Sequence, residues 1–152
     1  MRICVGGTFS PLHRGHKALL DAAFSWGDEV FIGLTTDRFA SESRAERVEP
    51  YTIRRQELER YLKGRYKKPY RIIPIDDPTG GGAVFSEELD GIVVSKETYE
   101  TARWINKERL KRGVKPLEIL VIDMVPSEIG EPIRGRLIRR GIMDVEGRVI
   151  KD

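Results

Sequence analysis

The chain has 152 residues with 27 Lys and Arg against 24 Asp and Glu, which gives a net charge of +3 and a pI near 9.1. A chain of this length can bury one sizeable core, so we expect a single domain over residues 1–152. No apolar run approaches the roughly 18 residues that a membrane-spanning helix needs. The mild basic excess suits a small anionic ligand and does not by itself indicate nucleic acid.

The first residues enter an apolar run directly and lack the basic-then-apolar pattern of a secretory signal. We therefore expect a cytoplasmic protein without a membrane partner. Cys4 is the only cysteine, which excludes an internal disulfide framework. Because Cys4 lies inside the first apolar run, we expect a small buried side chain there.

Short apolar runs rich in β-branched residues predict strands, and most lack the strict alternation of a half-exposed strand. They are Arg2–Val5, Glu29–Thr35, Tyr70–Ile75, Gly91–Ser95 and Glu118–Asp123. Apolar residues at helical spacing predict helices between them. These helices are Lys17–Trp26, Tyr51–Arg65 and Lys96–Arg112, followed by a short one over Pro132–Arg140 and an extended tail over Asp144–Asp152. The alternation favours an α/β, Rossmann-like domain of about five parallel strands with helices on both faces.

Apolar positions define the expected buried faces of the three longer helices. They are Leu19, Leu20, Ala23 and Phe24 in the first, Ile53, Leu58, Tyr61 and Leu62 in the second, and Tyr99, Ala102, Ile105 and Leu110 in the third. Ser95 is expected to cap the third of these helices, with Thr98 at its third helical position.

Residues 6–17, GGTFSPLHRGHK, follow the first predicted strand and lead into the first helix. Gly6 and Gly7 let the backbone come close to a ligand, because no Cβ stands in the way. His13 and His16 lie at the start of the helix, where unpaired N–H groups and the positive dipole end attract phosphate. In a parallel sheet such a turn lies at the carboxyl edge, where ligands bind.

Either feature alone is more often a plain turn or a pair of surface polar residues. Both histidines of the chain fall in this one turn, however, which favours a site. A metal centre would need a nearby Cys or carboxylate, which the segment lacks. The segment therefore predicts a nucleotide phosphate site that uses the glycines, His13, His16 and Lys17.

Three further segments are compatible with both a structural and a functional role. The first, residues 76–82 (DDPTGGG), is either a surface loop or a lid and contact to a second substrate. Lys96 lies at the end of the fourth predicted strand, beside Ser95, where it could also meet a phosphate. Four arginines near the C-terminus form either a solvated face or a triphosphate clamp through forked hydrogen bonds. They are Arg134, Arg136, Arg139 and Arg140.

The sequence His13-Arg14-Gly15-His16 resembles the T/H-x-G-H signature of the nucleotidylyltransferase superfamily, whereas Walker A and G-x-G-x-x-G patterns are absent. Over about residues 3 to 144 the chain resembles archaeal-type pantetheine-phosphate adenylyltransferases. The segments that carry this wider resemblance are Gly6–Phe9, Gly33–Asp37, Pro50-Tyr51 with Arg54, Ile92–Thr98, Ile105-Asn106 and Gly113–Leu117.

The resemblance implies transfer of AMP from ATP to 4′-phosphopantetheine, which gives dephospho-coenzyme A and pyrophosphate, with Mg²⁺ carried by the ATP phosphates. The acceptor phosphate has a second pKa of about 6, so it is largely ionised at neutral pH and needs no protein base. The protein then has to place two anions in line and stabilise charge at the α-phosphorus.

By position in the family pattern, Thr8 would hold the acceptor phosphate, and the main chain of Thr8 and Phe9 would touch the nucleotide. His16 would contact the reacting phosphates, with His13 near the triphosphate. The same resemblance places Asn106 and Arg109 on a helix that faces the nucleotide.

The chain departs from the family pattern at three places. Ser10 stands where the family has Asp, and residues 39–48 lack an expected lysine, which leaves Arg44 or Arg47. The second signature, Ile-Ser-Ser-Thr-x-Ile-Arg in the family, here reads IRGRLIR over residues 133–139, so Arg134 and Arg136 would replace phosphate-binding hydroxyls.

These departures leave two alternatives to phosphopantetheine adenylylation. One is another phosphate acceptor, such as nicotinamide mononucleotide, flavin mononucleotide or a polyol phosphate. The other is a nucleotide-binding paralogue that does not catalyse. We expect no nucleic-acid partner, and a homo-oligomer is compatible with the sequence.

Overall fold

The computed structural model describes residues 1–10, 12–43 and 48–122. In chain order the elements are β1 (Arg2–Gly7), α1 (Arg14–Trp26), β2 (Glu29–Thr35), α2 (Asp37–Ser43), α3 (Tyr51–Lys63), β3 (Tyr70–Ile75), the 3₁₀ turn η1 (Ala83–Phe85), β4 (Gly91–Ser95), α4 (Tyr99–Lys111) and β5 (Glu118–Ile122). The helix predicted over Pro132–Arg140, the tail after it and the arginine cluster lie outside the described residues.

The strands form one five-stranded sheet in the order β3-β2-β1-β4-β5, and every pairing is parallel. This confirms the Rossmann-like α/β fold expected from the sequence. From β1 the chain adds β2 and β3 on one side, then crosses to add β4 and β5 on the other. The order therefore reverses between β1 and β4, which is where ligands bind in open parallel sheets.

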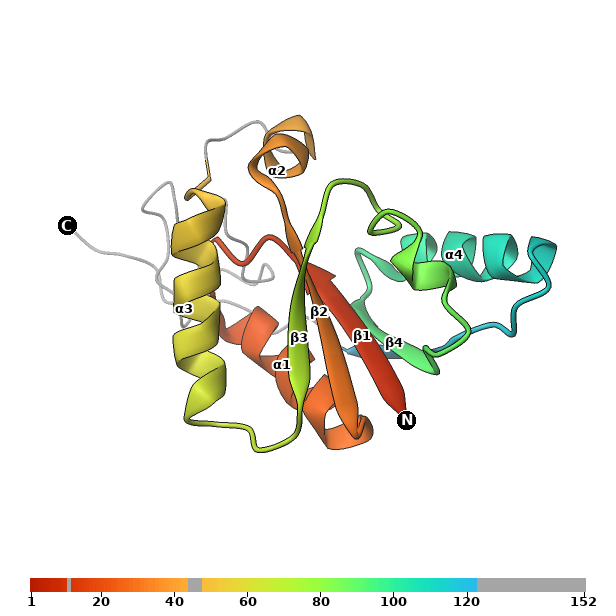
Figure 1. Cartoon of the computed structure of the whole chain (residues 1–152), viewed down its shortest axis with the longest axis horizontal. Coiled ribbons are helices and arrows are strands. Elements are labelled where there is room, and N and C mark those ends of the chain that lie inside the picture. Colours follow the sequence, from red (N-terminus) through yellow and green to blue (C-terminus); the bar gives the residue numbers. More distant parts are fainter. Residues whose placement is uncertain (11, 44–47, 123–152) are drawn as a thin grey trace.

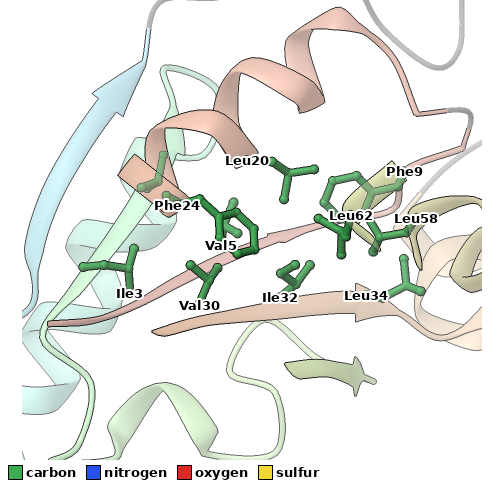
Figure 2. Close-up of a cluster of buried hydrophobic side chains, with 12 residues drawn as sticks. Ile3, Val5, Phe9, Leu20, Phe24, Val30, Ile32, Leu34, Leu58 and Leu62 are labelled. Atoms are coloured by element: carbon green, nitrogen blue, oxygen red, sulfur yellow. The ribbon is translucent and has the colours of Figure 1, made fainter. Parts of the chain in front are cut away.

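Helices α1 and α3 lie on one face of the sheet and α4 lies on the other (Figure 1). The core under α1 and α3 is built from alternate residues of the strands (Figure 2), because successive side chains of a strand point to opposite faces. Ile3 and Val5 of β1 point into this core, while Cys4 joins the core under α4. The predicted burial of Cys4 is confirmed.

Two helix starts differ from the sequence prediction. Helix α1 begins at Arg14, three residues before the predicted start, because the His13 side chain caps it. Helix α4 begins at Tyr99 with Thr98 at its N-cap, so the expectation that Ser95 caps this helix was wrong. The N–H of Ser95 instead donates to Thr98 Oγ1 over 3.2 Å, and this contact closes a turn before the helix. The sequence analysis did not predict α2 and η1.

Helices α3 and α4 each bury an arginine that the apolar pattern did not place on the buried face. Arg54 and Arg109 are 0% and 1% exposed, whereas Ile53, Tyr99 and Leu110 lie at the surface. The expected buried faces of both helices were therefore partly wrong. Arg54 is held by main-chain and side-chain acceptors and Arg109 by main-chain carbonyl groups, all outside the two helices, and apolar periodicity does not report such partners. None of the described helices is long and apolar enough to span a membrane.

The packing of Trp26 on Gly91 gives a direct test of the fold. A Cβ on Gly91 would lie 2.5 Å from the Trp26 ring, so Gly91→Ala should destabilise the protein by about 1–3 kcal/mol. Gly64→Ala is the matched control, because nothing lies within 4 Å of its Cβ position and its φ of −92° suits alanine. Urea unfolding measures both, and equal stability of the two variants would contradict this packing.

Candidate active site

The turn after β1 is shaped by Phe9, whose φ of 50° is the left-handed conformation that side-chain-bearing residues rarely adopt. Its side chain is buried, and its ring lies 3.1 Å from the position that a Cβ on Gly7 would occupy. A side chain at residue 7 would therefore force this ring to shift by a few tenths of an ångström. Such strained positions cluster at functional sites, so the conformation of Phe9 marks this turn as a candidate site.

The rings of His13 and His16 stack, and the Phe9 ring packs against His16 at a tilt. The ring centroids of His16 and His13 are 3.7 Å apart at an interplanar angle of 17°, and those of Phe9 and His16 are 4.7 Å apart at 54°. His13 is buried and His16 is half-buried. The structure thus brings the two histidines together, as the sequence predicted, and adds Phe9 as the support on which they rest.

Each histidine accepts a main-chain hydrogen bond at Nδ1. His13 Nδ1 accepts from the N–H groups of Gly15 and His16, over 3.1 and 3.4 Å, and His16 Nδ1 accepts from the N–H of His13 over 3.3 Å. An Nδ1 that accepts carries no hydrogen, so Nε2 is the ring nitrogen that can carry one. The hydrogen-bond pattern therefore makes Nε2 the donor of each imidazole.

This cap changes how the helix N-terminus can bind an anion. The sequence analysis expected unpaired N–H groups there, but those of Gly15 and His16 are already bound to His13. The positive end of the helix dipole remains. An anion at this helix start would therefore meet the helix dipole rather than the N–H groups of Gly15 and His16.

Lys17 extends from the first turn of α1 toward α3. Its Nζ lies 5.5 Å from the centroid of the Tyr61 ring, which also has the Arg65 guanidinium 5.3 Å away. Two cations thus share one aromatic ring near the histidine stack.

Arg54 of α3 ties the turn after β1 to the end of β2. Its Nη1 donates to Thr8 O and Thr35 Oγ1, over 3.0 and 3.1 Å, and Thr35 Oγ1 donates to Thr8 Oγ1 over 3.1 Å. Nε donates to Glu49 O and Nη2 to Asp37 Oδ1. In the sequence, Arg54 stood out only as one of the residues that carry the family resemblance. No local signal marks it, because its partners come from three other segments.

Ser10 and the end of β4 complete the described rim of the site. The buried Ser10 Oγ accepts the N–H of Glu49 over 3.1 Å, so this departure from the family pattern has a structural partner. Ser95, at the last position of β4, is buried, and Lys96 follows it exposed at the same edge of the sheet.

Asn106 and Arg109 have main-chain partners that give them structural roles. Asn106 binds both the N–H and the C=O of Leu117, over 2.8 and 2.9 Å, and so fixes the start of β5. The Arg109 guanidinium donates to carbonyl oxygens from the segments before and after α4 in the sequence. They belong to Val84, Ser86, Leu89 and Lys115. These contacts do not support the expectation that the two side chains face a nucleotide.

A largely apolar cavity of about 490 Å³ lies on the α4 face of the sheet. Gly6, Gly33 and Ile75 contribute to its lining from the strands, and Val84 and Ile105 do so from η1 and α4. Neither histidine lines it. Gly6 and Gly7 do, so the cavity reaches the same end of β1 from which the histidine turn departs.

Cys4 also lines this cavity, and burial raises the pKa of its thiol to about 12. The nearby positive charge of Arg109 opposes this shift only in part. Cys4 is therefore a protonated, unreactive thiol at neutral pH, since the thiolate is the nucleophilic form.

The loop after β3 is an ordered turn that contributes to the cavity wall. Asp77 Oδ1 accepts from the N–H and hydroxyl of Thr79 and from the N–H of Gly81, and these bonds, led by the hydroxyl, lower the pKa of the carboxyl group. Gly80, Gly81 and Gly82 have φ values of 62°, 66° and 92°, which only glycine adopts readily. Pro78, Thr79 and Gly80 line the cavity, in keeping with a substrate-contacting role for this loop.

Comparison with known proteins places the chain in a family. The profile of the family described as cytidylyltransferase-like matches residues 4–141. The chain therefore belongs to the cytidylyltransferase-like family, as the signature around His13 and His16 predicted.

Within that family the chain is similar to archaeal phosphopantetheine adenylyltransferases. The enzyme of that name from Methanothermobacter thermautotrophicus is 44% identical over 149 residues, which cover 98% of this chain and 89% of the relative. The one from Pyrococcus horikoshii is 44% identical over 154 residues, covering 99% and 95%. A solved Archaeoglobus fulgidus protein with unknown function has a TM-score of 0.74 at 36% identity, covering 88% of this chain and 100% of its own.

Substitution can separate the capping role of His13 from its predicted contact with phosphate. Asparagine keeps an acceptor at the N-cap, so His13→Asn should stay within about 0.5 kcal/mol of wild-type stability, whereas His13→Ala should lose about 1 kcal/mol. Both variants lack the Nε2–H donor, and nucleotidyl transfer should fall about 100-fold in each. Thermal unfolding and turnover measured on the same samples test this. Full turnover by His13→Asn would show that the ring acts only as a cap.

Proposed function

We propose that this protein is a nucleotidyltransferase that transfers AMP from ATP to 4′-phosphopantetheine, releasing pyrophosphate and forming dephospho-coenzyme A. One observation carries the proposal: Gly6 and Gly7 line an apolar cavity and lead directly into the turn that holds the stacked histidines. A single strand end thus joins a phosphate-handling turn to space for an uncharged organic arm. The names of the archaeal relatives support the same reaction.

On the phosphate side, the tasks of the groups follow from their positions in the family pattern and are compatible with their hydrogen bonds. Thr8 binds the acceptor phosphate, while the Nε2–H groups of His13 and His16 donate to the phosphates of ATP. Lys17 and the dipole of α1 add positive potential. The acceptor is already an anion, so these groups orient two phosphates and stabilise charge at the α-phosphorus without removing a proton.

On the cavity side, the apolar lining suits the methylene and dimethyl groups of the pantetheine arm. A polyol phosphate or a nucleoside monophosphate would place several hydroxyl groups against apolar walls, which is costly without partners. The arm ends in a thiol. The protonated Cys4 can lie beside it as a poor nucleophile, because the thiolate is the reactive form of a thiol.

Mg²⁺ fits this site as a companion of ATP. In the described part of the chain no group of three or more His, Cys, Asp and Glu side chains is placed to hold a metal ion. Mg²⁺ is commonly bound through substrate phosphates and water with few protein ligands. It would supply charge neutralisation on the triphosphate, and the predicted ligands Arg134, Arg136 and Arg139 would add to it.

Turnover tests the proposal directly. The purified protein with ATP, Mg²⁺ and 4′-phosphopantetheine should release pyrophosphate and form dephospho-coenzyme A, detected by mass spectrometry. His16→Ala should reduce kcat by about 100-fold or more while the protein remains folded. A panel with nicotinamide mononucleotide, flavin mononucleotide and a polyol phosphate is run in parallel. Transfer to one of these acceptors alone would reject phosphopantetheine.

A bulky residue in the cavity should separate the two substrates. Thr101 lines the cavity from the first turn of α4, and its neighbour Glu100 does not. Thr101→Trp should raise the KM for phosphopantetheine about tenfold and leave the KM for ATP unchanged. The tenfold rise corresponds to about 1.4 kcal/mol of lost contacts between the pantetheine arm and the cavity wall. Glu100→Trp, which breaks only an exposed ion pair with Arg103, should change neither. An equal rise in both KM values for Thr101→Trp would contradict the cavity's role.

A further inference from the structure

We propose that Arg54 and Thr35 are positioning residues that fix the Thr8 hydroxyl as a donor aimed at the acceptor phosphate. The inference rests on the proposed function, which gives Thr8 that phosphate. The observation behind it is a chain of three polar groups, in which Arg54 donates to Thr35 and Thr35 donates to Thr8.

The first step runs from Arg54 to Thr35, because a guanidinium donates hydrogen bonds and accepts none. Its Nη1 lies 3.1 Å from Thr35 Oγ1, so the Thr35 oxygen accepts. The geometry of the second contact makes the Thr35 hydroxyl the donor to Thr8 Oγ1, also over 3.1 Å. Because Thr8 Oγ1 accepts from Thr35, its own hydrogen points away from Thr35. A threonine hydroxyl that could otherwise rotate is thereby oriented as a donor.

Burial keeps this arrangement intact. Arg54, Thr35 and Thr8 are 0%, 7% and 5% exposed, so water competes little for their hydrogen bonds. A second Nη1 contact, to Thr8 O over 3.0 Å, holds the main chain of the same residue. Arg54 thus fixes Thr8 twice, through the carbonyl directly and through the hydroxyl by way of Thr35.

The sheet register brings the two threonines together. Gly7 and Leu34 are the last residues that pair between β1 and β2. Thr8 and Thr35 are the next residue of each segment, so they lie next to each other just beyond the paired region. The remaining donors of Arg54 bind Glu49 O and Asp37 Oδ1, which anchor the guanidinium independently of the threonines. The orienting hydroxyl can therefore be removed while the arginine and its charge stay in place.

Thr35→Val removes this hydroxyl and keeps a β-branched side chain, and Thr35→Ser is the conservative control that keeps the hydroxyl. Thr35→Val should raise the KM for phosphopantetheine about tenfold, with kcat and the KM for ATP within about twofold of wild type. Thr35→Ser should remain within about twofold in all three. Denaturant unfolding of each variant reports any loss of stability separately. An unchanged KM in Thr35→Val, or the same defect in Thr35→Ser, would overturn the proposal.

A double-mutant cycle with Thr8→Val distinguishes orientation from general damage to the site. If Thr35 acts through the Thr8 hydroxyl, adding Thr35→Val to Thr8→Val should leave the KM for phosphopantetheine unchanged. A further tenfold rise in the double variant would show that Thr35 acts by another route and would overturn the proposal.

Wild-type turnover separates this inference from the proposed function. If the wild type turns over phosphopantetheine, the kinetic comparison decides. If it turns over no phosphate acceptor, the proposed function fails, and calorimetric titration with inorganic phosphate then tests the positioning role alone. Weaker phosphate binding in Thr35→Val than in Thr35→Ser supports the orientation of Thr8, and equal binding refutes it.

Discussion

The parallel pairing of β1 with β2 holds the ends of both strands at one edge of the sheet, with Gly7 opposite Leu34. From that edge the chain enters the histidine turn on one side and α2 on the other, and Arg54 of α3 joins them. A buried guanidinium is costly unless acceptors surround it. Arg54 finds them in Thr8, Thr35, Asp37 and Glu49 only because the two strands end side by side.

The same strands divide the molecule into a filled face and a hollow face. Toward α1 and α3, the alternate residues of β1 and β2 are Val, Ile and Leu, and they pack into one continuous core (Figure 2). Toward α4, the corresponding positions include Gly6 and Gly33, which contribute no side chain and leave room for the cavity. A Cβ on Gly33 would lie 3.2 Å from the Ile75 side chain, so this glycine also lets β3 contribute to the lining. The cavity is thus a product of strand alternation together with two glycines.

The sequence predicted the five strands and the histidine turn because both depend on local pattern. Apolar β-branched runs specify strands without knowledge of their partners, and both histidines fall in one strand-to-helix turn. Arg54 and Arg109 could not be predicted in the same way, since arginine is usually exposed and their acceptors lie in distant segments. Asn106 shows the same limit: the family resemblance suggested a ligand contact, yet both ends of its amide bind Leu117, eleven residues away. Helix α2 was missed because its seven residues are too few to show a periodicity.

The capping contacts of the histidines decide which ring nitrogen each one can offer to a ligand. With Nδ1 of each ring bound to a main-chain N–H, that nitrogen is Nε2 in both His13 and His16. Arg54 shares its charge with Asp37, and Lys17 shares the Tyr61 ring with Arg65. In the proposed reaction, Mg²⁺ and the predicted ligands Arg134 and Arg136 would supply positive charge to the triphosphate, which gives a physical reason for arginines where the family pattern has neutral hydroxyls.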